Sequence, residues 1–205
     1  MGMHATLRRA STADVARLRA NPELVAAFLF GEPPVMVDAR PPGLLGLLLR
    51  FTPIKVRRAA DPQPQGPDQP TWPAAAEGDD VHLDKAWHGL HFMFTGTADG
   101  EEAPASYLLH GGEDLGDDDD LLPRLLHPEQ VRDFAAFLAA LTPEELTRRF
   151  DPERMTALGI YPDVIWRRPE ETDEPLGFLV EAFGRLRAFT AAAAAAGDAV
   201  VVCVA

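Results

Sequence analysis

The most informative segment for predicting the fold is Ala199-Val200-Val201-Val202-Cys203-Val204-Ala205. It carries no polar side chain, and its valines are β-branched, which favours extended backbone. An apolar run without polar alternation is typical of a strand that is buried on both faces. We therefore predict a central strand over 200–204, in which Cys203 is a small core side chain with its thiol pKa raised by apolar surroundings.

The sequence predicts two further elements besides this strand. Apolar residues repeat at intervals of three and four from Leu176 to Phe189, which predicts a long amphipathic helix that ends at Gly197. Met3 to Arg9 alternates apolar and polar side chains, which is the two-residue period of a half-buried strand. The predicted strands thus include the first and the last element of the chain.

Further helices are predicted from their start and stop signals. Ser11 and Asp14 favour a short helix after the first strand, and Pro22 to Gly31 brackets a second one. The leucine-rich run 44–51 favours a buried helix over a strand, because leucine lacks branching at Cβ. The remaining predictions are a helix over 82–95, a strand over 105–109, an acidic loop over 111–120, and helices over 128–141, after Thr142 and after Asp151.

The order of these elements predicts an α+β fold in a single domain that spans residues 1–205. The few strands pair non-locally, and several helices pack on one side of the sheet, because no βα repeat is present. A proline-rich segment over 59–80 interrupts the domain as a flexible insert. Trp72 within it either caps a cleft or folds back onto an apolar patch, and the second interpretation is favoured.

Composition and charge exclude several classes of function. The chain has 205 residues with 19 basic and 32 acidic side chains, a net charge of −13. A surface of that sign repels nucleic-acid phosphates. No stretch reaches the roughly 18 apolar residues that a membrane-spanning helix needs. With Cys203 as the only cysteine, the chain can form no internal disulfide.

One predicted helix concentrates the residues that could do chemistry. Asp84, His88 and His91 are spaced four and three apart, so on a helix over 82–95 they would share a face. Asp84 would then orient His88 and favour its charged form, as for a general base. Glu113 or Asp114 could complete such a cleft beside Gly111 and Gly112.

Metal and nucleophile chemistry have weaker support. His88, His91 and His110 are weak candidates for metal ligands, with Glu113 a further supplier, but their spacing does not match the HExxH pattern. Neither serine lies in a strand-turn-helix elbow. We predict no cofactor, and the favoured interpretation of the histidines is that they are hydrogen-bonded core or boundary residues.

Several motifs together resemble the YfbM-like proteins, a bacterial family without a characterised function. The resemblance rests on Met1-Gly2-Met3, the stretch from Asp84 to Phe92, the turn 111–116, Phe150-Asp151-Pro152 and the closing strand from Gly197. It covers most of the chain outside 57–80. It implies a compact α+β fold in the cytoplasm and no activity that could be carried over.

Two functional hypotheses remain. The first is a non-enzymatic binding protein, such as an inhibitor or immunity-like factor, whose acidic surface engages a basic protein partner. The second is a hydrolase or transferase with a cleft formed by Asp84, His88, His91, Glu113 and Asp114. The surroundings of His88 distinguish the two hypotheses. The sequence does not indicate an oligomeric state.

Overall fold

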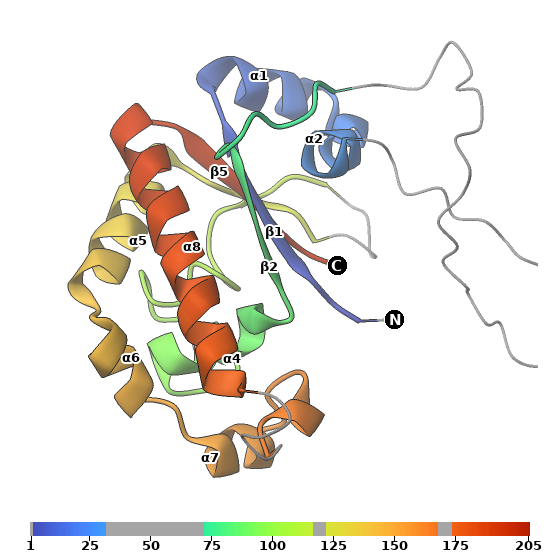
Figure 1. The fold of residues 1–205 in the computed structure, drawn as a ribbon. Coiled ribbons are helices and arrows are strands. Elements are labelled where there is room, and N and C mark those ends of the chain that lie inside the picture. Colours follow the sequence, from blue (N-terminus) through green and yellow to red (C-terminus); the bar gives the residue numbers. More distant parts are fainter. Residues whose placement is uncertain (1, 32–71, 117–121, 168–173) are drawn as a thin grey trace, which may run out of the picture.

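The computed structural model describes residues 2–31, 72–116, 122–167 and 174–205. The predicted helix over 44–51, most of the insert over 59–80 and the acidic residues 117–120 lie outside these ranges. Figure 1 shows a sheet with helices packed around it, which confirms the predicted α+β class.

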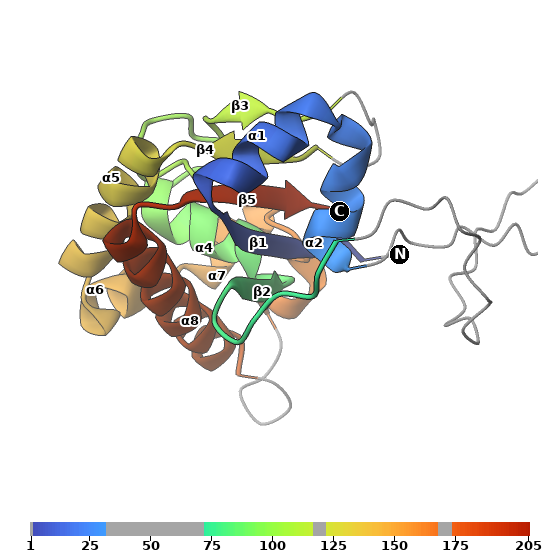
Figure 2. The ribbon, with the colours of Figure 1, turned by 90° about the horizontal axis from the view of Figure 1, so that it is seen from above.

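The sheet has five strands in the order β2-β1-β5-β4-β3, and every pair is antiparallel. Its strands are β1 (Ala5–Ala10), β2 (Asp80–Asp84), β3 (Glu113–Asp114), β4 (Arg124–Leu126) and β5 (Ala199–Val204). The last strand occupies the middle, and its register with the first runs from Ala5 opposite Val204 to Ala10 opposite Ala199. The predictions of a central C-terminal strand and of non-local pairing are confirmed (Figure 2).

Strand β5 is buried on both faces, and each face has its own core. Val200 and Val202 belong to the larger cluster, which includes residues of α4 (Ala86–Thr95), α5 (Pro128–Ala140) and α8 (Pro175–Ala196). Val201 and Cys203 belong to the smaller cluster, with α1 (Thr12–Ala20), the 3₁₀ turn η1 (Pro22–Leu24) and α2 (Val25–Phe30). The expectation of helices on one side only is therefore wrong. A strand with apolar side chains on both faces needs cover on both faces.

Two long side chains, Trp72 and Arg8, pack against Phe28 of the smaller core. Trp72 is buried against Phe28, with ring centroids 5.1 Å apart and rings nearly perpendicular. The Arg8 guanidinium lies over the same Phe28 ring at 4.5 Å and donates to the Phe28 carbonyl. The interpretation that Trp72 folds back onto an apolar patch is confirmed.

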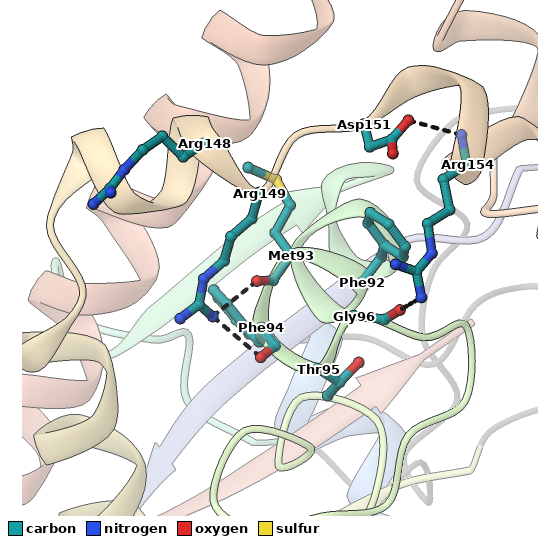
Figure 3. Close-up of a pocket in the computed structure, with 9 residues that line it drawn as sticks. All are labelled: Phe92, Met93, Phe94, Thr95, Gly96, Arg148, Arg149, Asp151 and Arg154. Carbon is teal, nitrogen blue, oxygen red and sulfur yellow. Dashed lines mark hydrogen bonds between the residues drawn. The ribbon is translucent and has the colours of Figure 1, made fainter.

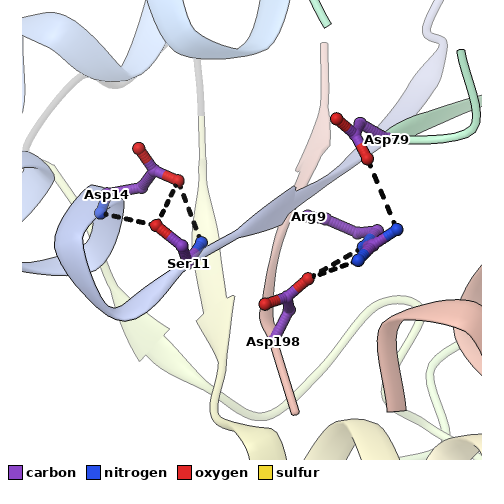
Figure 4. A network of polar contacts seen from close by, with 5 residues as sticks. All are labelled: Arg9, Ser11, Asp14, Asp79 and Asp198. Carbon is purple, nitrogen blue, oxygen red and sulfur yellow. Dashed lines mark hydrogen bonds and ion pairs between the residues drawn. The ribbon is translucent and has the colours of Figure 1, made fainter. Parts of the chain in front are cut away.

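Polar side chains form two sets of contacts where β1 leads into α1 (Figure 4). The Arg9 guanidinium donates to Asp198 Oδ2 from Nε at 2.9 Å and from Nη2 at 2.6 Å, and it pairs with Asp79 Oδ1 at 3.3 Å. It thereby links β1 to the residues that precede β5 and β2. Ser11 and Asp14 form a capping box that starts α1 at the predicted position.

The cap signals locate the remaining helices well. Thr142 caps α6 (Pro143–Arg148) through a capping box with Glu145, and the Asp151 side chain accepts from the Arg154 amide at the start of α7 (Pro152–Ala157). A second 3₁₀ turn, η2 (Asp163–Ile165), follows. Helix α8 ends at Gly197, which adopts the left-handed conformation as predicted.

Three local predictions in the middle of the chain are wrong. Residues 82–84 belong to β2, where Val81 and Leu83 are buried while His82 and Asp84 are exposed, so the period is two. The segment 105–109 forms turns instead of a strand, with the His110 amide donating to the Ser106 carbonyl. The predicted acidic loop contains β3, and β4 follows it. In the described parts of the chain, no helix is long and apolar enough to cross a bilayer.

Candidate functional site

Helix α4 lies in the larger core and is buried around most of its circumference. Eight of its residues are buried: Ala86, Trp87, Gly89, Leu90, His91, Phe92, Met93 and Phe94. A Cβ atom on Gly89 would lie 2.8 Å from Leu179 of α8 and 2.8 Å from Trp166, so only glycine permits this close approach. The histidines of α4 are thus held on a rigid central element.

Asp84 is not part of this helix. It is the last residue of β2, has a φ of +49°, and its Oδ1 lies 2.6 Å from Nδ1 of His4. Both side chains are about half exposed. The prediction that Asp84 sits one helical turn before His88 and orients it is therefore wrong, because the helix begins only at Ala86.

Both ring nitrogens of His88 are engaged by the backbone. The Tyr161 amide donates to Nδ1 at 2.9 Å, and Nε2 lies 2.9 Å from the Ala98 carbonyl. An amide can only donate and a carbonyl can only accept, so the ring is neutral with its proton on Nε2. Burial lowers the pKa of His88, which agrees with this assignment. A ring in this state has no unused lone pair with which to abstract a proton.

His91 has the opposite environment. Its side chain is fully buried, and neither ring nitrogen has a hydrogen-bond partner among the described residues; the same holds for Nε2 of His110. The rings of His91 and His110 meet edge to face with centroids 5.6 Å apart. Burial, reinforced by His110 and His88, lowers the pKa of His91 to about 4. His91 is therefore a neutral interior group at pH 7. The expectation that the histidines are hydrogen-bonded holds for His88 and is wrong for His91 within the described residues.

The metal hypothesis gains no support from this arrangement. His88 and His91 lie 6.5 Å apart by ring centroid, and both nitrogens of His88 are already occupied. Within the residues that the structure describes, no group of three or more His, Cys, Asp or Glu side chains could hold a metal ion.

Glu113 and Asp114 lie elsewhere. Glu113 accepts from Arg19 of α1, at 2.8 Å for Nε to Oε1, and pairs with Nε2 of His127 at 3.2 Å. The hydrogen bond from Arg19 lowers the pKa of Glu113. Because β2 and β3 form the two edges of the sheet, Asp84 and Glu113 are held at opposite edges. The five candidate residues are distributed over several environments and do not form the expected cleft.

A cavity of about 400 Å³ opens at the C-terminal end of α4. Figure 3 shows the side chains of Arg149 and Arg154 directed toward this helix end, whereas the Arg148 side chain extends away from it. Its lining includes three arginines and one carboxylate: Arg148, Arg149, Arg154 and Asp151. Sequence reasoning missed this site, because only the fold brings these arginines to the end of α4.

A groove of about 460 Å³ lies between the turns over 103–107 and helix α5. Its lining is apolar apart from the Tyr107 hydroxyl and the Asp133 carboxylate: Ala103, Pro104, Tyr107, Asp133, Ala136 and Phe137. Glu101 and Glu102 are exposed and directly precede the lining residues. Asp133 is exposed and belongs to no ion pair among the described residues. We refer to this feature as the acidic groove.

A family model and a solved structure match this chain. A family model described as "Domain of unknown function (DUF1877)" matches residues 1–203. The structure is similar to the crystal structure of YfbM, a protein of unknown function from Escherichia coli, with a TM-score of 0.61 over 98% of this chain and 99% of that chain. The two sequences are 16% identical, so this likeness shows the fold alone. No curated protein matches the chain.

Proposed function

We propose that this member of the DUF1877 family, whose function is unknown, is a binding protein. It engages a basic protein partner at the acidic groove. The single observation that carries this proposal is the position of Asp133. Its exposed carboxylate has no ion-pair partner among the described residues and lies in an otherwise mostly apolar groove. The net charge of −13 supports the same sign of partner.

The chemistry of the groove favours an arginine side chain as the occupant. Pro104, Ala136 and Phe137 offer apolar surface for the aliphatic part of that side chain. The Tyr107 ring offers a face on which a planar guanidinium can stack, and Asp133 supplies a counter-ion that accepts two hydrogen bonds. Glu101 and Glu102 add negative potential at the rim, which accelerates encounter with a basic segment.

The hydrolase or transferase alternative finds less support. It requires a lone pair on His88 and a carboxylate beside it, whereas the Tyr161 amide occupies Nδ1 and Asp84 pairs with His4. We therefore base the proposed function on the groove.

The test is a titration of the full-length protein with a fluorescent oligo-arginine peptide at low and at physiological ionic strength. We expect saturable binding that weakens with salt. The variant Ala136→Lys places a cation and a long side chain in the groove and is expected to weaken binding by about tenfold or more. Asp133→Asn is expected to weaken it by about fivefold.

Matched variants control for net charge. Ala139→Lys adds the same charge on the exposed side of α5 without lining the groove, and Asp163→Asn removes an exposed carboxylate from η2. We expect either control to change the dissociation constant by less than about twofold. If Ala136→Lys and Ala139→Lys raised the dissociation constant equally, peptide binding would depend only on the overall charge of the protein. The proposal would then be wrong.

A further inference from the structure

The cavity at the end of α4 has a charge that contrasts with the rest of the chain. Three arginines line it against the one carboxylate of Asp151, although acidic residues exceed basic ones by 13 in the whole sequence. Arg148 is partly neutralised, because its Nη2 lies 4.0 Å from Oε1 of Glu145. Asp151 is partly used as a cap, since its Oδ1 accepts from the Arg154 amide at 2.9 Å. The excess of formal side-chain charge therefore resides on Arg149 and Arg154, and the partial negative charge of the C-terminal carbonyls of α4 offsets part of it.

Backbone carbonyls hold these two guanidinium groups in place (Figure 3). Nη1 of Arg149 donates to the carbonyls of Met93 at 3.1 Å and Phe94 at 3.3 Å, and Nη2 of Arg154 donates to the Gly96 carbonyl at 2.9 Å. The Arg154 guanidinium also lies 5.8 Å from the centroid of the Phe92 ring. Both groups are thus oriented before any ligand arrives, which reduces the entropy cost of binding.

Capping of α4 explains these bonds but uses only part of each guanidinium. An arginine head group carries five N–H donors, and the contacts above engage one nitrogen of each. In the described ranges of the chain, neither Arg149 nor Arg154 forms an ion pair with a carboxylate. The remaining donors are available to a ligand of opposite charge.

We propose that this cavity binds a phosphate group, either inorganic phosphate or the phosphoryl end of a small monoester. A dianion offsets two guanidinium charges, and its oxygens match the fork of donors that arginine presents. The volume of about 400 Å³ lies in the range of small-molecule sites and exceeds what a phosphate alone would fill. The buried residues Phe92, Met93 and Phe94 also line the cavity, and the carbonyls of Met93 and Phe94 are already bonded to Arg149.

The test uses isothermal titration calorimetry and thermal melting of the full-length protein, with inorganic phosphate and phenyl phosphate as separate probes. Sodium chloride keeps the ionic strength constant. We expect saturable binding and a higher melting temperature for at least one probe. Tighter binding of phenyl phosphate would identify a monoester site, and equal or tighter binding of inorganic phosphate would identify a site for the ion itself.

Variants assign the binding to the cavity. Arg154→Gln and Arg149→Gln are each expected to weaken binding by about tenfold, because each removes charge-assisted hydrogen bonds. Arg132→Gln removes an equal charge from an exposed position of α5 and is expected to change it by less than about twofold. If Arg149→Gln unfolds through loss of its contacts to α4, Arg154→Gln alone decides. Absence of saturable binding, or an equal loss in Arg132→Gln, would overturn the proposal.

Discussion

His88 and His91 lie one turn apart on the same buried helix and are held by opposite means. The ring of His88 exchanges hydrogen bonds with the backbone at Ala98 and Tyr161. The ring of His91 is fully buried and has no hydrogen-bond partner among the described residues. Both are neutral at pH 7, because burial lowers both pKa values.

This contrast shows that a buried histidine can either stabilise or destabilise the fold. His88 satisfies one backbone group in the loop that directly follows α4 and one at Tyr161, 73 positions away, and so links both to the helix, which makes it a stabilising element. His91 was desolvated without compensation, so it costs free energy at neutral pH and more under acid. Histidine spacing on a helix therefore indicates neither chemistry nor stability until the partners of each nitrogen are known.

The largest effect that this comparison predicts is for His88→Leu. The substitution keeps an apolar side chain of similar size but leaves the Tyr161 amide and the Ala98 carbonyl without their partner. Each lost partner costs about 1–3 kcal/mol when the group stays buried, so we expect a loss of about 3 kcal/mol in the free energy of unfolding. Urea denaturation at pH 7 measures it.

Two conservative variants separate the contributions of the nitrogens. His88→Asn can place an acceptor near the position of Nδ1 and keep the bond from Tyr161, whereas His88→Gln can place a donor near Nε2 and keep the bond to Ala98. We expect each to lose less stability than His88→Leu. If all three variants are as stable as the original protein, His88 is not the link described above.

Much of the fold could be predicted from the sequence. The valine run 200–204 indicated a central strand, and the caps Ser11, Thr142 and Asp151 located three helix starts, because both signals are local. The short strands β3 and β4 could not be predicted in this way. Glu113 and Arg124 are polar residues whose extended backbone depends on pairing, of β3 with β4 and of β4 with the distant strand β5.

The candidate site was harder to predict for a related reason. A boundary error of a few residues placed Asp84 on the helix, and that error alone generated the Asp84–His88 pair. The arginine cavity depends on contacts such as Arg149 with Met93, which are separated by 56 positions in the chain. No spacing rule within one segment could have identified it.

The next effect is a loss of stability in acid, attributable to His91. The pKa of His91 is about 4 in the folded protein, whereas the ordinary value for an exposed histidine, as in the unfolded chain, is 6.5. Between these pH values the unfolded chain binds more protons, so stability is full above pH 6.5 and falls as the pH drops towards 4. The shift corresponds to about 3 kcal/mol, which urea denaturation across this pH range would measure.

The control for the acid effect is the same series on His91→Leu, which removes the titrating group. We expect its stability to depend less steeply on pH between 6.5 and 4, while the lowered pKa of His88 leaves a residual slope of the same sign. An unchanged slope in His91→Leu would assign the acid sensitivity to other residues and contradict the description of His91 as uncompensated.

The smallest effect concerns His91 at pH 7, where the sign is the informative quantity. His91→Leu removes two buried nitrogens that have no hydrogen-bond partner in the described part of the chain, and it keeps a similar apolar volume. We therefore expect the free energy of unfolding to stay within about 1 kcal/mol or to rise. His91→Asn keeps a polar group in the same place and leaves a void, so we expect it to lose about 2 kcal/mol. Thermal denaturation of both variants beside His88→Leu sharpens the comparison, because leucine should then destabilise one position of α4 and be tolerated at the next turn. A loss in His91→Leu as large as that in His88→Leu would mean that the ring of His91 makes a favourable polar contact after all.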